Sequence, residues 1–133
     1  MQELITFGCV KAVGSMLWAQ PDEAKYRELM KQIGPATAGL NKKVAAKDGS
    51  AAEDAKKLKA LFGEVQSFWK ARNATDALEA AGNAAVGFGM AGEHAASGMW
   101  DEAAASLKNA SANCASCHKA HREKADDGSW KIK

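Results

Sequence analysis

The chain contains little of what stabilises β-rich or disulfide-linked domains. Proline occurs only twice and tyrosine once, and the three cysteines are an odd number whose spacing does not suit a disulfide framework. Acidic and basic residues nearly balance, 16 against 18, and the lysines are scattered along the sequence. We therefore expect no nucleic-acid-binding surface, because such a surface needs clustered basic and aromatic residues.

Alanine, in contrast, is very abundant, and this composition is typical of helices rather than of a β-sandwich. The 133 residues are enough for one domain with one modest core. The sequence therefore predicts a single all-α domain.

Four helical patterns follow one another from Pro21, at about 22–47, 51–72, 75–97 and 100–124, and residues 129–133 form a short tail. Each pattern repeats by steps of three and four residues, as in a helix that packs in a bundle. Short loops favour antiparallel neighbours, so we expect an antiparallel four-helix bundle. The expected core positions are Tyr26, Met30, Ile33, Thr37, Leu40 and Val44; Ala55, Leu58, Phe62, Val65 and Trp69; Leu78, Ala81, Ala85, Phe88, Gly92 and Ala95; and Trp100, Ala104, Leu107, Ser111, Cys114, His118 and His121.

Several residues refine the expected helix ends and shapes. Asp22 is placed to cap the first helix, and Ser50 with Glu53 forms a capping-box pattern before the second. Pro35 lacks a backbone donor and is expected to kink the first helix near residues 31–34.

The third pattern is rich in glycine, at positions 82, 87, 89 and 92. Each glycine costs roughly 1 kcal/mol against alanine inside a helix. So many of them predict a close approach, either of another helix or of a flat ligand.

Cys114, Cys117 and His118 form the motif that most clearly indicates chemistry. Two cysteines three residues apart, followed at once by a histidine, are the attachment signature of a c-type haem. On a helix all three side chains project from one face, and that face lies on the stripe predicted to point into the bundle. Each thiol can add across one vinyl group, and the histidine can supply an axial nitrogen to the iron.

The motif has two other possible interpretations. A structural zinc site could use Cys114, Cys117, His118 and His121, although such sites usually draw ligands from two separated segments. A thiol–disulfide redox centre would need a strand–helix context that this chain lacks. Covalent haem c is the preferred prediction, and no enzyme signature was found.

Over residues 22–125 the chain resembles the class II c-type cytochromes, the cytochrome c′ family. The resemblance lies in Cys114–Arg122 near the end, Met30–Gly34 near the start, the Phe68-Trp69 pair and the Gly98–Trp100 turn. It implies a four-helix bundle with the haem motif on the last helix and His118 as the proximal ligand.

The resemblance also places Met30 on the open side of the haem. A methionine there can bind the iron and give a low-spin, six-coordinate electron carrier. The alternative is that Met30 only packs, and the haem is then five-coordinate, high-spin and able to bind nitric oxide or carbon monoxide.

Further residues follow from the same resemblance. Arg122 is expected near the proximal face or the haem carboxylates, or else simply as a cation favourable at a helix end. Tyr26 stands where the family often has an arginine, with Arg27 beside it. Of the remaining histidines and methionines, none is expected to bind iron: His94, His121, Met16, Met90 and Met99.

Residues 1–20 are mostly apolar from Leu4 to Ala19, but the stretch is too short and interrupted for a membrane span. It predicts either a secretion leader, which would also remove Cys9, or an extra N-terminal helix. A leader is preferred because the family attaches haem outside the bacterial cytoplasm. The expectation is thus a periplasmic electron carrier formed by residues 21–133, with transient redox partner proteins, no membrane contact after leader removal, and possible homodimers.

Overall fold

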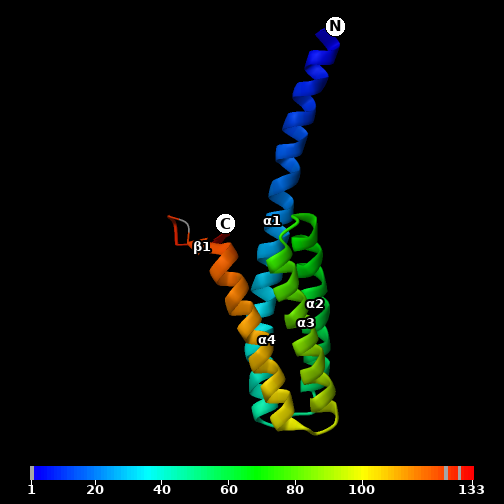
Figure 1. Cartoon of the computed structure of the whole chain (residues 1–133), viewed down its shortest axis with the longest axis vertical. Coiled ribbons are helices and arrows are strands. Elements are labelled where there is room, and N and C mark those ends of the chain that lie inside the picture. The colour runs from blue at the N-terminus through cyan, green and yellow to red at the C-terminus, as the bar shows by residue number, and fades with distance from the viewer. Residues whose placement is uncertain (1, 125, 129) are drawn as a thin grey trace.

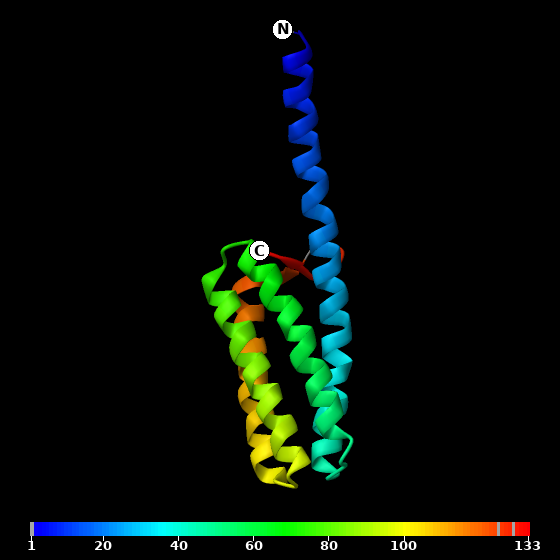
Figure 2. The same ribbon diagram turned by 90° about the vertical axis from the view of Figure 1, so that its right-hand side faces the viewer.

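The computed structural model is a bundle of four helices followed by a small hairpin (Figures 1 and 2). It describes the backbone of residues 2–124, 126–128 and 130–133, and the side chains of residues 23–124, 126–128 and 131–133. The elements are α1 (Gln2–Ala45), α2 (Ala51–Ala71), α3 (Thr75–Ala96), α4 (Trp100–His121), β1 (Arg122–Lys124) and β2 (Trp130–Ile132). The predicted all-α four-helix bundle is confirmed.

Short turns connect the helices, and each turn contains one residue with a left-handed backbone. These residues are Lys47, Asn73 and Gly98, with φ of 56°, 57° and 73°. A left-handed residue directly after a helix ends it by turning the chain back. Successive helices therefore run antiparallel, as the loop lengths predicted.

Helix α1 differs from its prediction in where it begins. It starts at Gln2, so Asp22 does not mark its first turn, and it continues through Gly34 and Pro35 without a break. A proline removes one backbone hydrogen bond but leaves the others on both sides in place. Cys9 and Met16 lie outside the residues whose side chains are described, and no helix in the described part is long and apolar enough to cross a membrane.

The core is continuous along α2. All five stripe residues predicted on this helix are buried, from Ala55 to Trp69, and they meet Leu40 of α1 and Phe88 of α3. The rings of Phe62 and Phe88 stack with centroids 5.3 Å apart. These contacts fix α1, α2 and α3 around one apolar interior.

The glycines of α3 allow close helix packing. A Cβ added to Gly87 would lie 2.9 Å from the Cβ of Ala110 on α4, and one added to Gly92 would lie 3.0 Å from the Cβ of Ala55 on α2. None of the four glycines lines the large cavity described below. Of the two predicted causes, the close approach of other helices is therefore the correct one.

Two predictions about helix ends were wrong. Ser50 makes no side-chain capping bond; instead Asp48 Oδ1 accepts hydrogen bonds from both the backbone N–H and the hydroxyl of Ser50, each at 2.9 Å. Helix α4 ends at His121 instead of Lys124, and the predicted tail forms β2, antiparallel to β1 with Arg122 opposite Ile132.

The prediction of one core residue on α4 was also wrong. Ala104 is exposed, whereas Ala103, Ser106 and Ala110 are buried together with Leu107. In the first half of the helix, Ala103 therefore takes the buried position predicted for Ala104, whereas Leu107 is buried as predicted.

Candidate functional site

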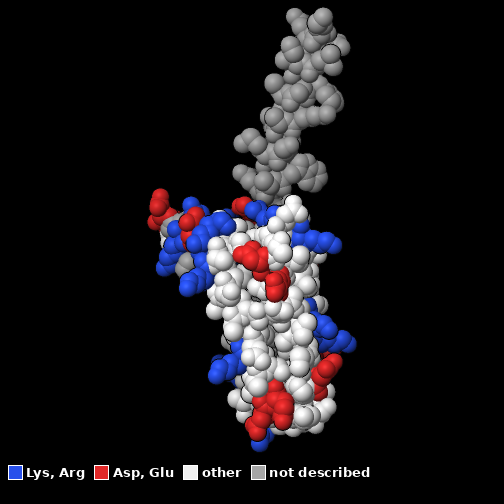
Figure 3. All heavy atoms as spheres, viewed as in Figure 1, with Lys and Arg blue, Asp and Glu red and all other residues white. Residues whose placement is uncertain are grey.

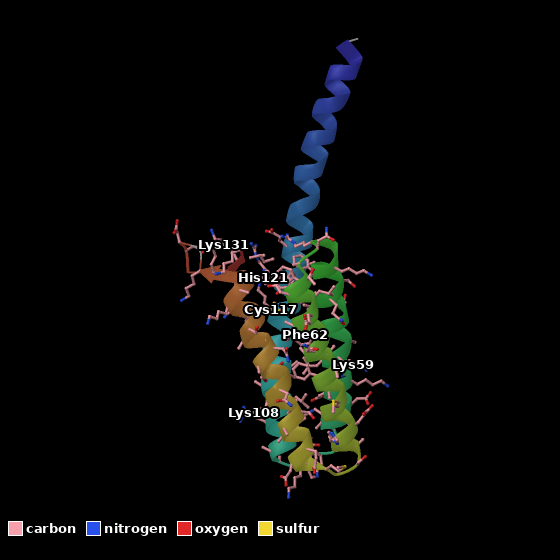
Figure 4. All side chains as sticks on the ribbon, viewed as in Figure 1. Lys59, Phe62, Lys108, Cys117, His121 and Lys131 are labelled. Atoms are coloured by element: carbon pink, nitrogen blue, oxygen red, sulfur yellow. The ribbon has the colours of Figure 1, made fainter. Side chains whose placement is uncertain are left out.

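The Cys114–His118 motif lies in the second half of α4, close to the hairpin. Cys114, Cys117 and His118 are all half-buried, and both cysteines are free thiols. Figure 4 shows Cys117 and His121 at the same end of the bundle as Lys131 of β2, whereas Lys59 and Lys108 lie further along and point outward. The motif thus occupies one end of the bundle.

The side chains of α4 are less buried at this end of the helix. Its buried residues stop at Ala110, and none of residues 111–121, all of which are described, is fully buried. In a bundle filled only by its own side chains, the core-facing stripe would stay buried along the whole helix. The second half of α4 therefore faces space that the protein does not fill.

That space is a cavity of about 970 Å³. Its apolar walls come from three helices, with Ile33 on α1, Phe62 and Val65 on α2, and Ala81 and Ala84 on α3. The motif on α4 completes the lining. A large apolar cavity with a few polar groups is typical of a small-molecule or cofactor site.

Met30 reaches the same cavity from α1. It is half-buried, packs against the core and lines the cavity together with His118. The structure thus brings together two residues that are far apart in the sequence. Thr37, the other half-buried position of the predicted α1 stripe, also lines the cavity, and its hydroxyl donates to the Ile33 carbonyl oxygen at 2.8 Å.

Basic side chains line the cavity as well. Arg122, predicted as a site residue, is among them, and so are Arg27 and Lys31 of α1. Tyr26 lines the cavity but is buried, since its ring stacks on Phe68 with centroids 4.5 Å apart. Burial, reinforced by the nearby Cys117, raises the pKa of Tyr26, so its hydroxyl stays protonated.

His121 lines the cavity and also contacts two neighbouring helices at this end. Its Nε2 lies 2.8 Å from Asp76 Oδ2 of α3, and its ring packs on Trp69 with centroids 4.8 Å apart. The contact lowers the pKa of the Asp76 carboxyl, chiefly through the hydrogen bond from His121. His121 therefore ties α4 to α2 and α3 at the cavity end.

The environment of the motif sets the protonation of its side chains. Burial raises the pKa of the Cys114 thiol, and burial together with Cys114 and Asp76 raises that of Cys117 to about 11. Both side chains are thus thiols and not thiolates near neutral pH. Burial, and then the positive charge of Arg122, lowers the pKa of His118, which favours the neutral imidazole with a lone pair free for a metal.

The other candidate ligands are not brought together. Among the described residues there is no group of three or more His, Cys, Asp or Glu side chains that could hold a metal ion, so the geometry gives no support to the zinc alternative. His94 is half-buried and does not line the cavity, as expected of a boundary histidine. Met90 and Met99 are exposed, at 46% and 43%, and neither is among the described residues that line the cavity.

Sequence reasoning missed the part of the site that follows the motif. Asp127, Lys131 and Ile132 of the hairpin line the cavity. The available signal was Asp127-Gly128 before Trp130-Lys131-Ile132, since an Asp-Gly pair beside an apolar segment favours a hairpin.

Comparison of the chain with protein-family models, with curated proteins and with solved structures found no match.

Proposed function

We propose that this protein is a single-haem c-type electron carrier, with Cys114 and Cys117 as the attachment sites and His118 and Met30 as the axial ligands. The observation that carries the proposal is that all four residues line one cavity of about 970 Å³, although they come from opposite ends of the chain. The apolar walls and the free thiols fit a covalently held flat ligand. Periplasmic location and transient redox partner proteins belong to the same proposal.

The chain's own residues have distinct tasks in this function. The two thiols would hold the ligand, because each could add across a haem vinyl group, with the S–H bond and the C=C π bond replaced by one carbon–sulfur and one carbon–hydrogen bond. His118 offers its neutral imidazole nitrogen, and Met30 offers its thioether from the opposite helix. Thioether ligation favours ferrous iron and raises the reduction potential.

Haem, when bound, supplies a one-electron couple between ferric and ferrous iron. The apolar side chains of Ile33, Phe62 and Val65 exclude water from the cavity wall. Phe62 and Val65 are almost fully buried in the bundle core and cannot rearrange freely. A fixed environment of this kind would favour the same protein ligands in both oxidation states.

The test is the optical spectrum of the haem-loaded protein, oxidised and reduced, for the wild type and for Met30→Ala. We expect a low-spin wild type with a weak far-red sulfur-to-iron band, and a high-spin Met30→Ala protein without that band. Met90→Ala is the matched control, because Met90 is exposed on α3 and should leave the spectrum unchanged.

Two results would overturn the proposal in different ways. A wild type that is already high-spin and binds carbon monoxide readily would favour the gas-binding alternative, with Met30 only packing. An intact mass without one added haem would remove the haem assignment altogether. The same mass shows whether residues 1–20 are cleaved from the mature protein.

A further inference from the structure

The hairpin that follows the haem motif is folded back onto the end of the bundle. Its strands pair from Arg122 opposite Ile132 to Lys124 opposite Trp130. The backbone N–H of Lys133 donates to the carbonyl oxygen of His121 at 3.0 Å, and Ile132 is half-buried against the core. The hairpin is therefore docked on α4 beside the motif.

The charges that line the cavity are mainly positive, and they lie on two sides. Arg27 and Lys31 stand four residues apart on α1, while Arg122 and Lys131 stand on the two strands of the hairpin. Asp127 is the single carboxylate among the lining residues that the structure describes. Figure 3 shows the lysine and arginine side chains that gather around the hairpin. An apolar interior with a cationic border suits a ligand that has an apolar body and anionic groups at its edge.

We infer that the C-terminal hairpin is a wall of the cofactor site, in which Ile132 covers the apolar body of the ligand and Lys131 binds one of its carboxylates. The inference rests on the proposed function, because haem carries two carboxylate groups. It assigns a ligand contact to a segment that follows the haem motif and that the sequence predicted only as a tail.

The present partner of Lys131 does not prevent this role. Lys131 Nζ lies 3.6 Å from Glu123 Oε1 on the opposite strand, and about half of each side chain is exposed, 50% and 47%. Exposed ion pairs of this kind contribute little stability. Lys131 can therefore turn from Glu123 to a ligand carboxylate at small cost.

The test uses the full chain with Cys114→Ala and Cys117→Ala, so that porphyrin binding stays reversible. Iron protoporphyrin IX and its dimethyl ester, which lacks the carboxylate charges, are titrated separately, and binding is followed by quenching of tryptophan fluorescence. Lys131→Gln is compared with Lys133→Gln, which removes the same charge from a neighbouring exposed residue that does not line the cavity.

We expect Lys131→Gln to weaken binding of the dicarboxylate porphyrin by about twofold to fivefold, the range of an exposed ion pair. The loss should shrink at high salt, because a half-exposed pair is screened. The affinity of Lys131→Gln for the ester should equal that of the wild type. The affinities of Lys133→Gln for both porphyrins should also equal those of the wild type. Equal effects of the two variants, or an equal effect of Lys131→Gln on acid and ester, would overturn the assignment.

A second variant separates the charge from the integrity of the hairpin. The exchange Glu123→Lys with Lys131→Glu keeps the cross-strand ion pair but places a carboxylate at position 131. This double variant should weaken binding of the dicarboxylate porphyrin at least as much as Lys131→Gln does. Unchanged binding would contradict the inference. The intact mass of the wild type shows whether haem is covalently attached, and this tests the proposed function alone. The proposed function and the inference about the hairpin can therefore fail separately.

Discussion

The two halves of the bundle use the same helix in different ways. Near the turn at residues 97–99, α4 buries Ala103, Leu107 and Ala110, and Gly87 of α3 lets the backbones come close. Near the hairpin, the continuation of α4 carries the Cys114–His118 motif beside a large cavity.

The division extends to the other helices. α2 packs closely on α3, and α3 on α4, whereas α1 touches α4 only sparsely. The cavity lies where Met30 of α1 faces the motif on α4. The sparsest packing between neighbouring helices, that of α1 on α4, thus coincides with the candidate site. A ligand in the cavity would contact both helices where their side chains do not contact each other.

The largest expected difference between the halves is in core truncation. Leu107→Ala should cost about 2–5 kcal/mol of the free energy of unfolding of the haem-free protein, because Leu107 is fully buried. Met30→Ala should cost less than about 1 kcal/mol there, because Met30 is half-buried and already borders a cavity. Denaturant unfolding measures both, and equal losses would show that the halves are packed equally well.

A smaller contrast is expected for glycine substitutions. Gly87→Ala should destabilise the protein, since overpacking costs about 1–3 kcal/mol and exceeds the roughly 1 kcal/mol gained in helix propensity. Gly63→Ala should stabilise it by about 0.5–1 kcal/mol, because Gly63 lies in the interior of α2 and an added Cβ there meets nothing within 4 Å. Thermal unfolding of both variants shows whether each substitution raises or lowers the stability of the protein. A stabilising Gly87→Ala would mean that α3 and α4 can separate at no cost.

The sequence predicted the large elements well and the end of the chain poorly. The α2 stripe was predictable because its large apolar residues, such as Leu58 and Phe62, recur at helical spacing. The buried face of α4 could not be predicted in the same way, because Ala103 and Ala104 are equally small. Only the packing against α3 decides which of the two is buried.

The motif and Met30 could be placed on core-facing stripes from spacing alone, and the structure brings them to one cavity. The Asp127-Gly128 pair is a local signal for the hairpin turn, but the docking of the hairpin on the bundle depends on the contact of Ile132 with the core, which no local pattern contains. The capping box failed because Asp48 offers Ser50 a closer local partner.

The smallest expected effect concerns the ion pair that ties α4 to α3 at the cavity end. The hydrogen bond from His121 lowers the pKa of Asp76, so its stabilising effect is present above the ordinary aspartate value and is lost as the pH falls through the lower, folded-state value. Asp76→Asn should therefore unfold slightly more easily than the wild type at pH 6, and the difference should vanish at a pH well below the ordinary pKa of aspartate.

The matched control for this variant is Glu79→Gln, which removes an exposed carboxylate from the same helix. Its unfolding should follow the wild type at both pH values. A pH-independent difference for Asp76→Asn would show that its carboxylate charge is not what stabilises the contact with His121.

Helix termini are where helices fray, and the last turn of α4 carries Cys117, His118 and His121. The carbonyl oxygen of His118 accepts from the N–H of Arg122, and that of His121 accepts from the N–H of Lys133. These bonds satisfy carbonyl groups that a free helix end would leave to water. The amide hydrogens of this turn should consequently exchange with solvent more slowly than those of an ordinary terminal turn, and the turn that bears the histidine opens less often than its position in the helix would suggest.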